Sequence, residues 1–110
     1  PNYVTNKVIK SKIHVLNDLK NDKLNLNNKI VVISQADPGY DWIFSYKIKG
    51  LITKYGGIGS HMAIRCAEFD LPAAIGCGKK LYDDLVDIDS VTLDCNNKKI
   101  IAHKGNEILN

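Results

Sequence analysis

Cysteine is scarce in this chain, whose 110 residues include only Cys66, Cys77 and Cys95. No two of them form a C-x-x-C pair, and each lies in or beside an apolar run. A disulfide framework needs paired cysteines and an oxidising compartment, so none is predicted. We expect the three thiols to be small core residues of a protein in a reducing, cytoplasmic environment.

An excess of charge of one sign is also lacking, since 15 basic residues against 12 acidic ones give a net charge of +3. The lysines are scattered along the chain, which argues against a nucleic-acid partner. No apolar run approaches the roughly 18 residues that suggest a membrane span, and no signal-peptide pattern is present. The length suits one domain, residues 1–110. Because the sequence starts at Pro1 and not at methionine, we expect this domain to be excised from a larger multidomain protein.

Short apolar runs separated by glycine, proline and asparagine predict a mixed α/β fold in which strands outnumber helices. Strands are predicted over 4–16, 29–34, 50–53, 90–93 and 99–102, with another near Pro72; helices are predicted over 38–46 and 61–69, and one helical turn over 80–85. The run at 29–34 is apolar enough for the centre of a sheet. The strand, helix and strand that follow residue 50 predict a parallel crossover. Residues 17–29 are expected to form a loop anchored by leucines, with a short helical turn as the alternative, and the tail from Gly105 predicts nothing.

The most informative stretch is the glycine-rich turn 56–59, which leads through Ser60 into His61 and a predicted helix. Serine is a favoured N-cap residue, and the free N–H groups and dipole of a helix N-terminus stabilise an anion. A neutral imidazole has one nitrogen lone pair that can attack phosphorus, and glycines leave room for a donor. We therefore interpret His61 as a covalent phosphoryl carrier. The residues expected to support the phosphate are Gly56, Gly57, Gly59 and Ser60.

Arg65 lies four residues after His61 and Glu68 lies seven residues after it, so the three share one face of the predicted helix. A guanidinium binds phosphoryl oxygens well. An ordinary surface pairing with Glu68 or Asp70 explains this arginine equally well, and both interpretations stay open.

Taken alone, a glycine turn and a histidine at a helix start are more often structural than catalytic. Two nucleotide-binding motifs are excluded. No Gly-Lys-Ser or Gly-Lys-Thr follows the turn, as a P-loop requires, and the third glycine of the dinucleotide fingerprint is missing.

Other candidate residues are weaker. His14 and His103 lie in predicted strands without Cys, Asp or Glu at metal-ligand spacing, so no metal site is predicted. Tyr40, Trp42 and Tyr46 fit the core side of an amphipathic helix, with a patch for a partner domain as the less favoured alternative.

Several segments together resemble the swivelling phosphohistidine domain of the phosphoenolpyruvate (PEP)-utilising enzymes. That family includes pyruvate phosphate dikinase, phosphoenolpyruvate synthase, enzyme I of the sugar phosphotransferase system and the rifampicin phosphotransferases. The residues that carry the resemblance are Gly50-Leu51-Ile52-Thr53, Gly56-Gly57, Ser60-His61, Ala63-Ile64, Leu71-Pro72-Ala73 and Gly76. A joint pattern of this kind is far more specific than any single piece.

The resemblance implies a β/β/α swivelling domain whose His61 carries a phosphoryl group between active sites on neighbouring domains. In the family, one site belongs to an ATP-grasp nucleotide-binding domain or a PEP/pyruvate barrel, and the other belongs to the acceptor. The implied function is that of a phosphoryl-carrier domain of a PEP synthase-like or pyruvate phosphate dikinase-like phosphotransferase, which does not turn over alone. The domain is expected to bind no cofactor itself, with Mg²⁺ and ATP or PEP held by partner domains.

The chain departs from the family pattern at three places. Many members have an arginine where this chain has Ala67, acidic residues where it has Lys54 and Tyr55, and a threonine where it has Gly59. Arg65 is the candidate to replace the missing arginine. The alternative function is a non-catalytic swivelling or docking module that has kept the fold and lost phosphoryl transfer.

Overall fold

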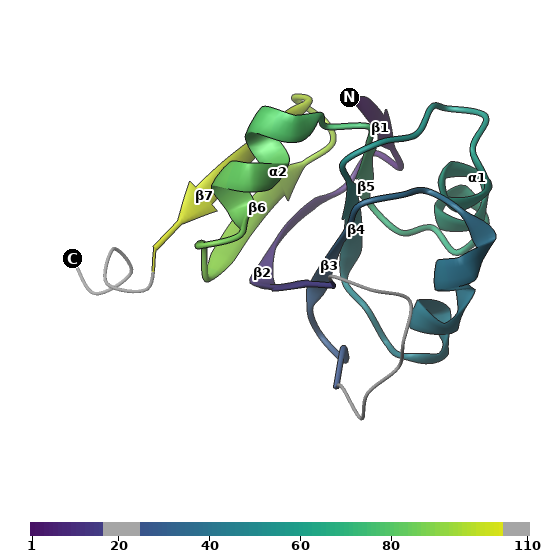
Figure 1. Cartoon of the computed structure of the whole chain (residues 1–110), viewed down its shortest axis with the longest axis horizontal. Helices are drawn as coiled ribbons and strands as arrows, with labels where there is room; N and C mark the ends of the chain where they lie inside the picture. Colours follow the sequence, from purple (N-terminus) through teal and green to yellow (C-terminus); the bar gives the residue numbers. More distant parts are fainter. Residues whose placement is uncertain (17–24, 105–110) are drawn as a thin grey trace.

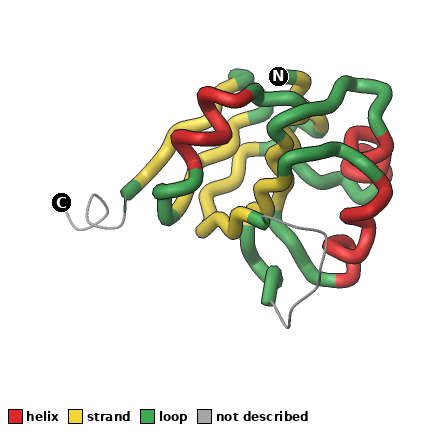
Figure 2. The backbone as a smooth tube through the Cα atoms, viewed as in Figure 1, coloured by secondary structure: helices red, strands yellow, loops and turns green. Residues whose placement is uncertain are grey.

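The computed structural model describes residues 1–16 and 25–104, which fold into a curled mixed sheet with helical segments on both sides. The seven strands lie in the order β1-β5-β4-β3-β2-β6-β7. They are β1 (Asn2–Val4), β2 (Val8–Val15), β3 (Ile30–Ile33), β4 (Gly50–Thr53), β5 (Ala73–Ile75), β6 (Ser90–Asp94) and β7 (Lys99–His103). The helical segments are η1 (Pro38–Ser45), α1 (His61–Glu68) and α2 (Lys79–Leu85). Figure 1 shows η1 and α1 together on one side and α2 on the other, and Figure 2 shows the strands between them.

β3 is the middle strand, as its apolar sequence predicts, and all four of its residues are buried. Its parallel neighbours are β2 and β4. Val31 and Ile33 belong to the core cluster that includes η1 and α1, whereas Ile30 and Val32 belong to the cluster that includes α2 and β6. Alternate side chains of one strand therefore hold both layers to the sheet, which is why the run is apolar at every position.

The helices next to β3 and β4 are short and amphipathic. In α1, Met62, Ala63 and Cys66 are buried, at the spacing of one helical face. η1 is a 3-10 helix that begins at Pro38 and is capped by Asp37, whose carboxylate accepts the N–H of Gly39 at 2.8 Å. Capping and the fixed φ of proline explain why this segment starts where the sequence predicts.

The prediction of one strand over 4–16 was wrong, because the chain turns at Thr5, where φ is +67°. β1 pairs antiparallel with β5, whereas β2 pairs with β6 through Val8–Lys12 and with β3 through Ile13–Val15. The other predicted strands, the parallel crossover from β4 to β5 and all three helices are confirmed, and β6 and β7 form an antiparallel hairpin. Of the predicted loop 17–29, residues 17–24 lie outside the described part of the chain, as does the tail from 105.

The cysteines lie largely in the interior as free thiols. Cys66 and Cys95 are buried and Cys77 is half-buried. Burial raises the pKa of the Cys66 thiol to about 12, so this group stays protonated at neutral pH. Within residues 1–16 and 25–104, none of the helices is long and apolar enough to cross a membrane.

Candidate functional site

The site is assembled at one edge of the sheet, where two neighbouring parallel strands end. η1 follows β3, and the glycine-rich turn with α1 follows β4. β3 and β4 pair in register from Ile30 with Gly50 to Ile33 with Thr53. The carboxyl ends of parallel strands meet at the same edge, which is where α/β folds place their ligand sites. The topology thus brings η1 close to the start of α1.

A buried threonine fixes the base of the glycine-rich turn. The hydroxyl of Thr53 donates to the carbonyl oxygen of Tyr55 and accepts the N–H of Gly76, each at 2.9 Å. Gly56 has a φ of +128°, and a Cβ added there would lie 2.6 Å from the Cβ of Ala36. Any side chain at residue 56 would strain the backbone and clash with Ala36, so the turn requires glycine at this position.

The other two glycines of the turn have a different setting. A Cβ added at Gly57 or Gly59 would meet no described atom within 4 Å, and neither has a positive φ. Their missing side chains thus leave open space before α1. Ile58 between them is 69% exposed.

His61 is the first residue of α1, and Ser60 is its N-cap, as predicted. The Ser60 hydroxyl accepts the N–H of Ala63 at 3.3 Å. The N–H groups of His61 and Met62, before Ala63, have no acceptor within the helix, so they remain available to an anion. The His61 side chain is 36% exposed. A donor can therefore reach the ring from solvent.

Asp41 of η1 holds the imidazole through both carboxylate oxygens. Its Oδ1 and Oδ2 lie 2.7 and 2.9 Å from Nε2 of His61. A carboxylate can only accept hydrogen bonds, so Nε2 carries a proton in this arrangement and the lone pair of the neutral ring is on Nδ1. The contact fixes both the orientation and the tautomer of His61.

Arg65 lies beside this pair and is held by aromatic rings. Its guanidinium carbon lies 5.4 Å from the centre of the Phe44 ring and 4.7 Å from that of Phe69. Its Nε lies 3.8 Å from Oδ1 of Asp41, which is too long for a hydrogen bond. This Nε is buried and has no hydrogen-bond partner among the described residues. The structure thus places an unused donor next to the carboxylate that binds His61.

The two interpretations of Arg65 can now be compared. Glu68 lies 3.8 Å from Nη1 of Arg65, and both side chains are partly exposed, so that pairing is weak. Of the two acidic partners considered, the structure pairs Arg65 with Glu68, whereas Asp70 binds Lys7 at 2.7 Å. Arg65 and His61 lie together as predicted, whereas the role of Arg65 toward phosphate stays a prediction.

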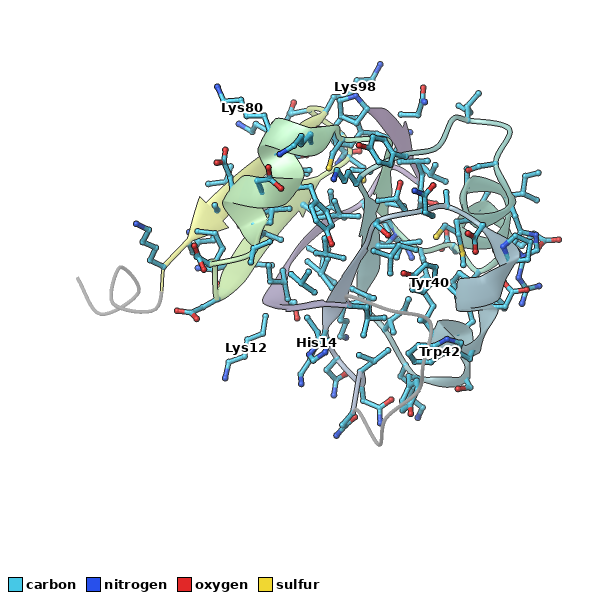
Figure 3. All side chains as sticks on the ribbon, in the orientation of Figure 1. Lys12, His14, Tyr40, Trp42, Lys80 and Lys98 are labelled. Atoms are coloured by element: carbon cyan, nitrogen blue, oxygen red, sulfur yellow. The ribbon has the colours of Figure 1, made fainter. Side chains whose placement is uncertain are left out.

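Three further residues, Lys54, His103 and His14, have their side chains away from the site. The ammonium of Lys54 lies 5.0 and 5.1 Å from the ring centres of Tyr55 and Tyr82, and Tyr82 belongs to α2. His103 makes a 2.9 Å hydrogen bond with Thr92 on the neighbouring strand. His14 lies on β2, away from η1 and α1 (Figure 3). The described ranges contain no group of three His, Cys, Asp or Glu residues able to hold a metal.

The aromatic residues of η1 pack mainly inward. Tyr40 is buried in the core cluster, and Trp42 and Tyr46 are partly buried against it. The Trp42 and Tyr46 rings meet edge to face, with their centres 6.5 Å apart. Figure 3 shows Tyr40 and Trp42 on η1, beside the sheet. The favoured interpretation, core packing, fits this arrangement better than a patch for a partner.

Asp41 is the site residue that the sequence interpretation missed. It lies 20 positions before His61, and nothing local marks it as different from other surface aspartates. The available signal was topological: an acidic side chain in the helix after one buried strand, and a histidine in the helix after the next. Neighbouring parallel strands would bring such residues together.

Comparison with known proteins gives these features a family. The profile described as "PEP-utilising enzyme, mobile domain" matches residues 25–98. The rifampicin phosphotransferase of Bacillus cereus is 33% identical over 73 residues, and that of Bacillus subtilis is 34% identical over 73 residues. Each match covers 66% of this chain and 8% of the relative. The resemblance inferred from the motifs is confirmed, and the chain belongs to the mobile-domain family of the PEP-utilising enzymes.

Proposed function

We propose that this chain is the phosphoryl-carrier domain of a larger PEP-utilising phosphotransferase, with His61 as the residue that is transiently phosphorylated. The observation that carries the proposal is the position of His61, which is reachable from solvent, first in α1 and preceded by the open turn at Gly57 and Gly59. In the transfer, an imidazole nitrogen uses its lone pair to bond to phosphorus. The P–O bond of the donor breaks, and its electron pair leaves on the donor oxygen.

The other half of the reaction belongs to partner domains. The two relatives are named for phosphoryl transfer to rifampicin, and the matched stretch is a small part of each. We infer that the donor site is an ATP-grasp domain or a PEP/pyruvate barrel, with Mg²⁺ bound alongside the donor there. A PEP synthase-like or pyruvate phosphate dikinase-like reaction is the specific form that we propose. The domain alone is not expected to turn over.

The decisive experiment supplies labelled donors to the whole protein. With ATP labelled at either the β- or the γ-phosphate, or with labelled PEP, we expect a label on the peptide that contains His61. The label should be lost in acid and kept in base, as a phosphoramidate is. If none of these donors labels His61, the carrier role is wrong and the non-catalytic module is the better description.

Exposed apolar side chains beside His61 are the part of the surface that we expect to meet the donor domain. Ile58, three residues before His61, is 69% exposed, and Ile64, three residues after it, is 53% exposed. Replacing Ile58 with serine removes apolar contact area without adding charge. We expect the rate of His61 labelling by the donor domain to fall about tenfold, because one buried isoleucine contributes roughly 1.5 kcal/mol or more.

A matched control separates docking from chemistry. Val86, which ends α2 on the other side of the sheet, is 52% exposed. Val86→Ser should leave the labelling rate unchanged. Phosphoramidate, a chemical donor that needs no docking, should phosphorylate His61 equally fast in both variants. Equal donor-domain rates in the Ile58 and Val86 variants would show that Ile58 is not a docking contact.

A further inference from the structure

We propose that, in the resting domain, the carboxylate of Asp41 occupies the place that the phosphoryl group takes when His61 is phosphorylated. This inference rests on the proposed function and concerns how the same site is regulated. Asp41 is then an anion supplied by the domain itself. His61 must release it before it can accept a phosphoryl group, and its negative charge destabilises the phosphorylated state afterwards.

The first support is the set of groups around the carboxylate. Oδ1 and Oδ2 of Asp41 lie 2.7 and 2.9 Å from Nε2 of His61, and Oδ1 lies 3.8 Å from Nε of Arg65. A ring nitrogen and a guanidinium are the partners that a phosphoryl group on this histidine requires. The carboxylate fills the space between them.

The second support is the unused donor of Arg65. Its Nε is buried without a hydrogen-bond partner in the described part of the chain, and it lies 3.8 Å from the same Asp41 oxygen that contacts Nε2 of His61. A buried donor of this kind is costly unless another state of the protein uses it. The rings of Phe44 and Phe69 hold the guanidinium in place. The cation is therefore prepositioned, and a phosphoryl group larger than a carboxylate can reach it.

The third support is electrostatic exclusion. A phosphoryl group on Nε2 carries up to two negative charges and would lie against the negative charge of Asp41. Both anions cannot share the nitrogen, because the group replaces the proton that the carboxylate accepts. Asp41 therefore stabilises the free histidine and destabilises the phosphohistidine. Both effects raise the tendency of His61 to pass its phosphoryl group on.

Phosphorylation at Nε2 requires a change of tautomer, because Nε2 carries the proton in the resting domain. Nε2 leaves Asp41, and the ring proton moves through solvent from Nε2 to Nδ1. The Nε2 lone pair then bonds to phosphorus while the P–O bond of the donor breaks and its electron pair stays on the donor oxygen. Arg65, whose Nε has no hydrogen-bond partner in the described part of the resting domain, then donates to the phosphoryl oxygens. η1 thereby loses its hydrogen bond to the start of α1, so the contact between Asp41 and His61 reports the phosphorylation state.

The test treats the whole protein with phosphoramidate, which phosphorylates histidine without a partner domain, and measures the ratio of phosphorylated to free His61. Asp41→Asn keeps the size of the side chain and removes its charge. We expect this variant to raise the ratio about tenfold, since a like charge within about 4 Å is worth roughly that much even at high dielectric. Asp41→Glu, which keeps the charge, is the matched control and should stay near the wild type. Arg65→Gln should lower the ratio.

A second measurement separates charge from structure. Raising the ionic strength from about 0.05 to about 0.5 M should increase the wild-type ratio relative to that of Asp41→Asn, because salt screens the repulsion by Asp41 in the wild type alone and the attraction of Arg65 in both proteins. The position of phosphorus on the wild-type ring, read by NMR, needs no variant to fold. An unchanged or lower ratio in Asp41→Asn, or phosphorus found on Nδ1 by NMR, overturns the proposal. Absence of label from ATP and PEP instead refutes the proposed function, and the phosphoramidate comparison still decides the role of Asp41.

Discussion

Replacing His61 with glutamine is expected to abolish phosphorylation from ATP or PEP, with a loss of at least about a thousandfold. The glutamine amide can still reach toward Asp41, but it has no nitrogen lone pair that can attack phosphorus. His61 is partly exposed at the start of α1, so the free energy of unfolding should change by less than about 1 kcal/mol. Labelling of the whole protein and a thermal melt measure the two quantities separately.

The matched control for this result is His103→Gln. His103 lies on β7, where it is hydrogen-bonded to Thr92, and it has no place in the proposed chemistry. Its replacement should leave the label intact. A label that survives in His61→Gln, or that disappears in His103→Gln while the fold is kept, would contradict the assignment of His61 as the carrier.

The largest effect on stability is expected from Gly76→Ala, a loss of about 3 kcal/mol or more. Gly76 has a φ of +77°, and an added Cβ would overlap the carbonyl oxygen of Gly56. The left-handed backbone alone costs an alanine about 1 to 2 kcal/mol. The clash adds to this because Thr53 holds the N–H of Gly76 in place, so the loop cannot simply move aside. Urea unfolding measures the change.

Substitutions at two other glycines separate the cost of the backbone conformation from the cost of the clash. Gly78 has a φ of +89° and a ψ of 168°, a conformation almost restricted to glycine, but an added Cβ would meet no described atom within 4 Å, so Gly78→Ala should lose only the backbone part, about 1 to 3 kcal/mol. Gly57 has neither feature, and Gly57→Ala should be close to neutral. If Gly76→Ala costs no more than Gly78→Ala, the packing of residue 76 against residue 56 does not hold the turn.

Most of the fold was predictable because its causes are local. The run Ile30–Ile33 is apolar at every position and became the central strand. Pro38 and Ser60 mark helix starts through their own backbone and side-chain preferences, and both helices begin there. The order of strand, helix and strand after Gly50 predicts the parallel crossover, because a right-handed connection between parallel strands is strongly preferred.

What could not be predicted depends on contacts between distant segments. The alternation over 4–16 is consistent with one strand, and only the pairing of β1 with β5 requires the break at Thr5. The contact between Asp41 and His61 likewise exists only once β3 and β4 lie side by side. The rings of Phe44 and Phe69, which contact Arg65, join η1 to the end of α1. The apolar periodicity of neither segment predicts this contact.

The pairing of β3 with β4 also makes His61 a reporter of correct strand register. Both strands are buried throughout, so a shifted alignment could still bury apolar side chains. Each residue of shift would displace η1 from α1 by about 3.3 Å, more than the contact between Asp41 and His61 can absorb. A misaligned molecule would bury its apolar residues and still lack the hydrogen bond between the Asp41 carboxylate and the His61 imidazole. The NMR signal of that ring can therefore distinguish native molecules from compact misfolded ones.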